Sequence, residues 1–247
     1  MIDTHAHLDA CNEDAATLVA RAGAAGVETI VSIGTGVESC RATVALAEAH
    51  PSVYAAVGID PHKAATDSSR AAELRAFLGH PRVVAVGETG LDYHYGADAK
   101  REQRRLFEEQ LALADEAAKA VVIHCREAVR DTADILAAFR GTVVLHCFSE
   151  PDLLPAALKR GYYVSFAGNA TYPRSADLRE AAARVPAERL LVETDSPYLA
   201  PQPMRGRANE PAHLVHTVAV LAVVRGVARD ELEALIAANA RAAFGLA

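Results

Sequence analysis

The chain has 247 residues, of which 51% are hydrophobic and 23% are charged. This balance is typical of globular proteins and excludes a disordered chain. The formal net charge of -7 disfavours a protein that holds nucleic acid over a broad cationic surface, but it leaves room for a local site that attracts phosphate.

Short runs of β-branched residues alternate along the chain with alanine-rich stretches of helical length. Predicted strands cover residues 2–5, 29–33, 53–57, 83–86, 121–124, 142–146, 162–166 and 190–193. Predicted helices cover residues 13–24, 37–49, 69–78, 99–118, 127–139, 151–160 and 176–183, and two more, 211–224 and 229–242, follow the last strand. This alternation predicts parallel strands joined by right-handed crossovers. Eight such units in about 250 residues favour a closed (β/α)8 TIM barrel, a single domain over residues 1–247.

The cysteines and the apolar stretches indicate in which cellular compartment the protein is expected. The four cysteines form no CxxC pair, so we expect reduced thiols and a cytoplasmic protein. The first residues do not have the pattern of a signal peptide. The longest apolar helical run, residues 212–224, is too short and too polar to cross a bilayer, and we expect no membrane partner.

Catalytic groups of such barrels lie at the carboxyl ends of the strands. The predicted strand ends carry four imidazoles and two carboxylates, namely His5, His7, Glu88, His124, His146 and Asp195. His5 and His7 are two residues apart, so they are expected to point to the same interior face. A lone histidine on a strand is usually a core residue. Four histidines and two carboxylates together at one end of a barrel indicate metal binding.

Six ligands are too many for one tetrahedral ion that keeps an open position, and they suit two ions that share a carboxylate. Imidazole and carboxylate are ligands for Zn, Mn, Fe, Co or Ni. Two divalent ions and two carboxylates leave a positive local charge that attracts an anion. Such a pair of ions activates water for hydrolysis of a phosphodiester, an ester or an amide.

Several motifs along the chain match one family. They are Asp3-Thr4-His5-Ala6-His7-Leu8, Gly87-Glu88-Thr89-Gly90-Leu91-Asp92-Tyr93, Gln103-x3-Phe107-x2-Gln110-Leu111, His124-Cys125-Arg126, His146-Cys147-Phe148-Ser149, Glu193-Thr194-Asp195-Ser196-Pro197-Tyr198-Leu199 and Arg205-Gly206-Arg207-Ala208-Asn209-Glu210-Pro211. As an ordered set they resemble the TatD-like metal-dependent deoxyribonucleases of the amidohydrolase superfamily.

The resemblance implies a role for each ligand. His5, His7, Glu88 and Asp195 would hold one ion, and Glu88, His124 and His146 the second, with Glu88 as the bridge. A water that bridges the ions would attack, and Asp195 would accept its proton. The implied reaction is 3′-5′ exonuclease cleavage of DNA, with DNA ends or single strands as the substrate. Zinc is the expected ion, with magnesium or manganese as alternatives, and no obligate protein partner is expected.

One motif departs from the family. The family commonly has Gly-x-His-Pro-His after the third strand, whereas this chain has Gly58-Ile59-Asp60-Pro61-His62. Asp60 therefore replaces a histidine and adds a negative charge near the pocket mouth, which bears on the substrate more than on hydrolysis itself. His62 is retained and is expected to reach a substrate phosphate.

Other residues are expected to contact the substrate or to support the ligands. Arg126 follows a ligand, and Arg205, Arg207 and Asn209 lie after the last strand, where barrels often bind phosphate. Strand alternation turns Cys125 and Cys147 away from the interior. The chain has no Trp and only 5% aromatic residues, so no base-stacking platform is expected and a short groove for a strand end is favoured.

Two other functions remain open. One is two-metal hydrolysis of a different ester or amide, such as the ester of a mischarged aminoacyl-tRNA. The other is a catalytically inactive barrel that binds partners, which the intact ligand set argues against. A P-loop and a nucleophile elbow are missing from the sequence, which disfavours a P-loop NTPase and a serine hydrolase.

Overall fold

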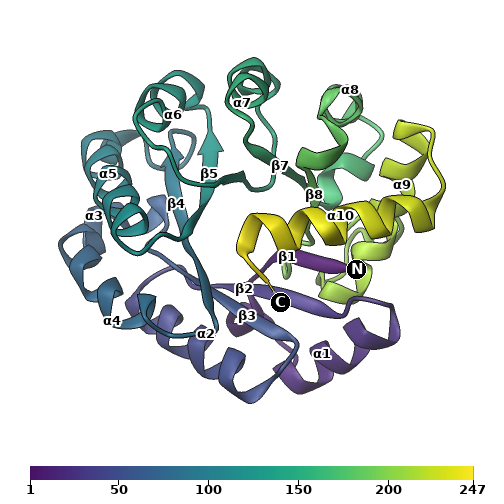
Figure 1. The fold of residues 1–247 in the computed structure, drawn as a ribbon, viewed down its shortest axis with the longest axis horizontal. Helices are drawn as coiled ribbons and strands as arrows, with labels where there is room; N and C mark the ends of the chain where they lie inside the picture. Colours follow the sequence, from purple (N-terminus) through teal and green to yellow (C-terminus); the bar gives the residue numbers. More distant parts are fainter. Residues whose placement is uncertain (247) are drawn as a thin grey trace.

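The strands pair in chain order and wrap into a barrel (Figure 1). The computed structural model describes residues 1–246. The strands, all parallel, are β1 (Ile2–Ala6), β2 (Thr29–Ile33), β3 (Val53–Val57), β4 (Val83–Asp92), β5 (Ala120–Arg126), β6 (Val143–Leu145), β7 (Tyr163–Phe166) and β8 (Leu190–Val192). A parallel bridge between Ala6 and Ser196 joins β1 to the segment after β8. The predicted (β/α)8 barrel is confirmed.

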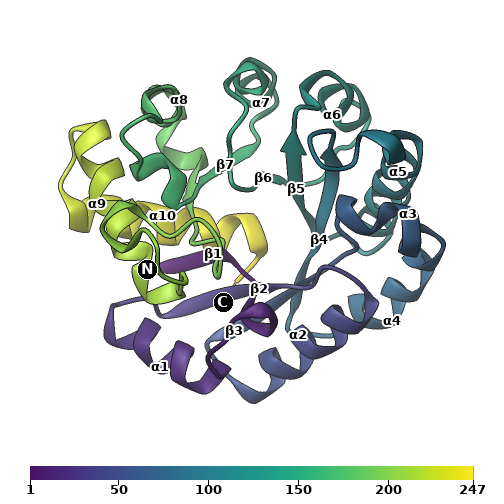
Figure 2. The ribbon, with the colours of Figure 1, turned by 180° about the vertical axis from the view of Figure 1, so that it is seen from behind.

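Helices surround the strands on the outside of the barrel (Figures 1 and 2). They are α1 (Ala15–Ala24), α2 (Val37–Ala49), α3 (Ala64–Asp67), α4 (Arg75–Leu78), α5 (Lys100–Glu116), α6 (Val129–Leu136), α7 (Leu154–Arg160), α8 (Ala176–Arg184), α9 (Leu214–Arg225) and α10 (Arg229–Phe244). The single helix predicted over residues 69–78 is wrong: a 3-10 helix, Ser68–Leu74, precedes a short α4. Aspartate and serine at its start favour turns over regular helix.

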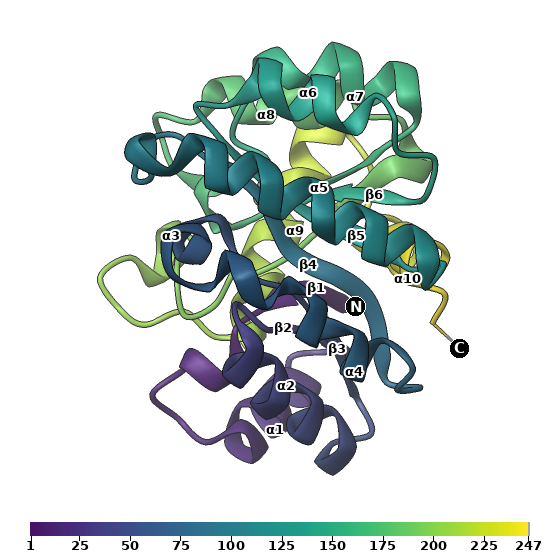
Figure 3. The same cartoon turned by 90° about the vertical axis from the view of Figure 1, so that its left-hand side faces the viewer.

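The core has two parts, on the two sides of the strand wall. Outward-facing strand residues pack against the ring of helices. Inside the barrel, apolar residues of the strands such as Ile33, Val122 and Leu191 pack with Ala240 and Phe244 of α10. Figure 3 shows α10 and both termini toward one side, while the loop after β8 extends from the opposite side. Helix α10 therefore closes the amino-terminal end of the barrel. The polar side chains lie at the opposite, carboxyl end.

Among residues 1–246, no single helix is long and apolar enough to cross a membrane. Residues Pro211–Arg225 and Arg229–Phe244 reach that length and composition only as a pair, with a bend of 108° between them. Both helices of this pair bury side chains such as Leu221 and Ile236 in the core.

Candidate metal centre

The first group of donor atoms comes from β1, β4 and the segment after β8. The Nε2 atoms of His5 and His7 are 3.2 Å apart. Each also faces Oε2 of Glu88, at 3.5 and 3.8 Å, and Oδ1 of Asp195, at 3.6 and 3.4 Å. A tetrahedral ion with ligands at about 2.0–2.1 Å separates them by about 3.3 Å. The five distances, from 3.2 to 3.8 Å, are therefore close to those between ligands around one cation.

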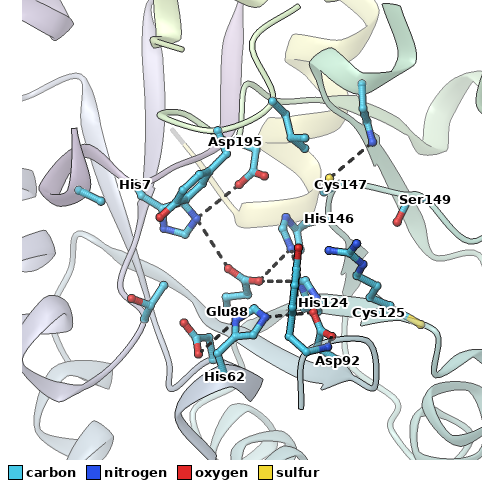
Figure 4. Close-up of a pocket in the computed structure, with 18 of the residues that line it drawn as sticks. His7, His62, Glu88, Asp92, His124, Cys125, His146, Cys147, Ser149 and Asp195 are labelled. Carbon is cyan, nitrogen blue, oxygen red and sulfur yellow. Dashed lines mark hydrogen bonds and ion pairs between the residues drawn. The ribbon is translucent and has the colours of Figure 1, made fainter. Parts of the chain in front are cut away.

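The second group lies on the other side of Glu88 (Figure 4). Oε1 of Glu88 is 2.8 Å from Nδ1 of His124 and 3.0 Å from Nε2 of His146. The two histidine nitrogens are 3.2 Å apart. The three donor atoms thus converge on one point, which offers a cation fewer protein ligands than the first group does.

Glu88 is shared by the two groups through different oxygens. Oε2 faces His5 and His7, and Oε1 faces His124 and His146. A carboxylate that offers one oxygen to each of two sites is the arrangement needed for a bridging ligand. The donor set of imidazoles and carboxylates fits zinc and neighbouring divalent ions.

Local irregularities in the strands aim these side chains. The pairing of β1 with β2 shifts between Asp3 and Ala6, and the pairing of β4 with β5 shifts between Val86 and Thr89. Each shift includes a metal-ligand candidate, His5 or Glu88. Bulges are common beside active sites because they redirect a side chain. Simple strand alternation therefore does not describe the ligand positions fully.

The outer nitrogens of three imidazoles are held by other groups. Nδ1 of His7 lies 3.3 Å from the carbonyl oxygen of Ile33. Nδ1 of His146 lies 3.2 Å from Oε1 of Glu193, and Nε2 of His124 lies 3.1 Å from Oδ2 of Asp92. Such partners fix the orientation and tautomer of a metal-binding imidazole and raise its basicity.

Asp92 is a residue whose role the sequence reasoning missed. The strand was expected to end at residue 86, but β4 continues to Asp92. Its carboxylate lies within hydrogen-bond distance of His62 and His124. Glu88 and Asp92 are four residues apart, and side chains an even number of residues apart on one strand share a face. This spacing could have predicted that Asp92 lies beside the ligands.

Opposite charges shift the pKa values inside the cluster. Burial alone would raise the pKa of Glu88, but the imidazoles of His146, His124 and His5 hold that pKa well below its usual value. Burial opposes charge on His124 too, yet Asp92 and Glu88 raise the pKa of His124 to about 9. The pKa of His146 is raised as well, whereas burial lowers that of His5. Without cations, protons therefore stay on His124 and His146, and cation binding releases them.

Two buried acids below the ligands hold the backbone of the site. Asp3 accepts hydrogen bonds from the backbone nitrogen and the hydroxyl of Thr194, at 2.9 and 2.6 Å. Burial raises the pKa of Asp3 to about 7. Oε1 of Glu193 accepts a bond from the backbone nitrogen of Cys147 at 2.7 Å. Asp3 thereby ties β1 to the segment that carries Asp195.

The substrate-contact candidates divide into two groups. His62 and Arg126 line a pocket of about 670 Å³ above the donor atoms, and so does Asp60. Asp60 also caps a 3-10 helix, because its Oδ1 accepts a bond from the backbone nitrogen of Lys63. Burial and the nearby carboxylate of Glu88 raise the pKa of Asp60.

The three candidates after β8 lie outside the pocket lining. Arg205 is exposed, with its guanidinium carbon 4.3 Å from the ring centre of Tyr172, and Arg207 is exposed as well. Asn209 is buried, and its amide nitrogen donates to the carbonyl oxygens of Thr194 and Tyr198. These contacts leave the Asn209 amide no free donor for a substrate.

Cys147 does not lie where strand alternation places it. It lines the pocket instead of the layer between strands and helices. The reason is local: β6 ends at Leu145, and Cys147 has a left-handed backbone with φ of 42°. Asp195 is left-handed too, with φ of 56°. Such conformations in residues other than glycine cluster at functional sites.

The pocket is less positive than the sequence suggests. Five carboxylates line it, those of Asp9, Asp60, Glu88, Asp92 and Asp195. Among the described lining residues, Arg126 is the one guanidinium or ammonium group. Two divalent cations and Arg126 together would only balance these acids. An anion would therefore be held by direct contact with the cations and Arg126, not by an extended positive surface.

A parallel barrel with imidazole and carboxylate clusters at its carboxyl end defines a metal-dependent hydrolase. Comparison with known proteins agrees: the family model described as TatD related DNase matches residues 2–245. The chain belongs to the TatD related DNase family.

Relatives match almost the whole chain. It is 43% identical to the "Uncharacterized metal-dependent hydrolase TatD" of Mycobacterium tuberculosis, over 100% of this chain and 98% of that protein. It is 39% identical to the "3'-5' ssDNA/RNA exonuclease TatD" of Pantoea vagans, over 95% of this chain and 94% of that protein. The structure of YjjV, a TatD homologue from Escherichia coli, superposes with a TM-score of 0.94 at 30% identity, over 100% of this chain and 98% of that one.

Proposed function

We propose that this metal-dependent hydrolase is a nuclease that removes nucleotides from the 3′ end of single-stranded DNA. The observation that carries the proposal is the division of Glu88, whose two oxygens face two separate sets of donors. Two cations held there would suit displacement at phosphorus, because they would stabilise charge on the attacking and the leaving oxygen.

The protein would bind one cation through His5, His7, Glu88 and Asp195, and a second through Glu88, His124 and His146. Bound there, two divalent cations would supply an activated water and offset the charge of a phosphate. We propose zinc as the physiological ion, with magnesium or manganese as alternatives, because imidazole supplies four of the donors.

The chain's own residues complete the reaction site. Asp195 faces the pocket beside His7 and is placed to accept a proton from the attacking water. His62 has a side chain that is 44% exposed and lies 3.0 Å from Asp92. With both ring nitrogens protonated, His62 donates from Nε2 to Asp92, which fixes the ring, and can donate from Nδ1 to a substrate oxygen. Arg126, at the pocket wall, can pair with a phosphate.

Pocket size and charge support attack at a strand end. A pocket of about 670 Å³ is in the range that holds one small ligand, such as a nucleotide unit. With Arg126 as the one guanidinium or ammonium group among the described lining residues, the pocket has no row of phosphate contacts for a long strand. The exonuclease names of relatives from Pantoea vagans and Erwinia amylovora agree with this substrate class.

The test is incubation of the metal-loaded protein with single-stranded DNA labelled at its 3′ end. We expect stepwise, cation-dependent release of labelled mononucleotides, and no release after chelation or in Asp195→Asn. Absence of nucleotide release, together with turnover of carboxylic esters or aminoacyl-tRNA, would contradict the nuclease proposal and favour the other hydrolase function.

A further inference from the structure

Two tyrosines at the pocket mouth are exposed although most large apolar side chains are buried. Among the described residues, the exposed large hydrophobic side chains are Tyr95, Tyr198 and Val223, at 70%, 57% and 82%. Both tyrosines line the pocket. Exposed aromatic rings gathered at a pocket mark a binding surface more often than chance exposure does.

Each tyrosine stands beside a different half of the donor set. The Tyr198 ring centre is 5.8 Å from that of His7, in the first group. The Tyr95 ring centre is 6.0 Å from that of His62, which in turn lies 5.6 Å from the ring of His124 in the second group. The two rings therefore flank the place where the reacting group would lie.

Hydrogen bonds hold the backbone that carries both rings. The Tyr95 nitrogen donates to Oδ1 of Asp92 at 2.8 Å. The Tyr198 nitrogen donates to the carbonyl oxygen of Asp195 at 2.8 Å, and its own carbonyl accepts from Asn209 at 2.7 Å. Asn209, expected to contact substrate, instead holds the segment that presents Tyr198. Rings on a backbone that is already held lose less conformational entropy when a ligand binds.

Arg126 occupies one side of the Tyr95 ring. Its guanidinium carbon lies 4.6 Å from the ring centre, a cation–π distance. The His94 ring stands nearly perpendicular to that of Tyr95, with ring centres 4.6 Å apart, and at 70% exposure much of the Tyr95 side chain still faces solvent. A base stacked on Tyr95 would have its phosphate within reach of Arg126, which pairs aromatic and cationic contacts as in other single-strand sites.

We propose that Tyr95 and Tyr198 are base-stacking surfaces that hold the two nucleosides on either side of the phosphate that is cleaved. This inference rests on the nuclease function proposed above. It departs from the expectation, based on composition, that the chain has no base-stacking platform. Stacking accepts any base, so the two rings give binding without sequence preference.

The test compares two single-stranded thymidine oligonucleotides, one intact and one whose last two 3′ nucleotides lack bases. Stacking is worth about 1–3 kcal/mol per base, or about 5- to 150-fold. We expect wild-type kcat/KM to fall at least about 10-fold when the bases are removed. Tyr95→Leu and Tyr198→Leu should lose a similar factor on the intact strand but match the wild type on the base-free strand. Tyr95→Phe and Tyr198→Phe should retain activity.

Intrinsic fluorescence gives a second readout. The chain has seven tyrosines and no tryptophan, so bases stacked on Tyr95 and Tyr198 should quench a measurable fraction of its tyrosine fluorescence. A phosphorothioate oligothymidylate should quench the wild type more than the double leucine variant. Equal cleavage of both strands by the wild type overturns the stacking inference alone, as does equal quenching. If the wild type cleaves neither strand, that result overturns the nuclease function and this inference with it.

Discussion

Glu88 joins the two halves of the site because its two oxygens face different pairs of imidazoles. Their places at strand ends predicted that Glu88, the four histidines and Asp195 would be metal ligands, and the resemblance to the family implied that Glu88 is the bridge. The sequence could not indicate which nitrogen of each ring faces the centre. His124 presents Nδ1 while His5, His7 and His146 present Nε2, and only the packing around each ring decides that.

We propose Asp195 as the proton acceptor, so its substitution should affect chemistry more than folding. We expect Asp195→Asn to lower kcat about 100- to 10,000-fold, the range typical of a lost general base. The measurement is steady-state hydrolysis at saturating cation, with circular dichroism to confirm the fold. A variant with near wild-type kcat and a full complement of metal would show that another group takes the proton.

Asp92 holds His124 from outside the donor set, at 3.1 Å. Loss of such a partner commonly costs about 10- to 100-fold in metal affinity. We therefore expect Asp92→Asn to weaken binding of one cation by that factor in a calorimetric titration with Zn²⁺, and to leave the other unchanged. Asp98→Asn, at an exposed position in the segment that follows β4, is the matched control. Equal titrations for Asp92→Asn and the wild type would refute this role.

At the scale of the element, β4 shows where strand prediction succeeds and where it stops. The β-branched run at residues 83–86 identified the strand, but Gly87 and Gly90 hid its continuation to Asp92, because glycine usually weakens strands. The reason for Gly90 is spatial. It has φ of 136°, and a Cβ there would lie 2.0 Å from the carbonyl oxygen of His124.

We expect Gly90→Ala to lower the free energy of unfolding by at least about 2 kcal/mol, since the clash is with backbone that cannot yield. It should also weaken cation binding, because His124 must move. Gly79→Ala is the control: nothing lies within 4 Å of its added Cβ, and its φ of -80° suits alanine, so its stability should change by less than about 1 kcal/mol. Urea denaturation followed by circular dichroism measures both. Similar curves for the two variants would disprove the close approach.

The loop after β8 illustrates what motif spacing cannot give. Arg205, Arg207 and Asn209 are close in sequence, but the structure places the two arginines in solvent and the asparagine inside. The sequence also gave no sign that Tyr95 and Tyr198 would meet at one pocket, since they follow different strands. Contacts between loops depend on the closed barrel, which brings the ends of all strands to one rim.

At the scale of the whole molecule, the apolar packing that stabilises the barrel and the polar cluster of the candidate site lie at opposite ends. Helix α10 seals the amino-terminal end through Ala240, Ala243 and Phe244, and the polar cluster occupies the opposite end. The alternation of strands and helices was sufficient to predict the barrel. The sealing role of the last helix could not be predicted, because an apolar face does not specify which surface it covers.

Phe244→Ala should therefore reduce stability while sparing the site. Truncation of a buried phenylalanine costs about 3–5 kcal/mol, and Phe244 is 5% exposed. Val223→Ala, at a side chain 82% exposed, should change stability by less than about 0.5 kcal/mol. Thermal unfolding measures the difference, and kcat per folded molecule should stay near that of the wild type. A stability loss as small as that of Val223→Ala would show that α10 does not seal the barrel.

The central claim is that Glu88 bridges two cations. Anomalous diffraction at the zinc edge, from crystals of the zinc-loaded protein, tests it most directly. We predict two peaks about 3.5–4 Å apart, one beside His5 and His7 and one beside His124 and His146, with an oxygen of Glu88 on each. A single peak in zinc-saturated crystals, or two peaks that Glu88 does not join, would contradict the account.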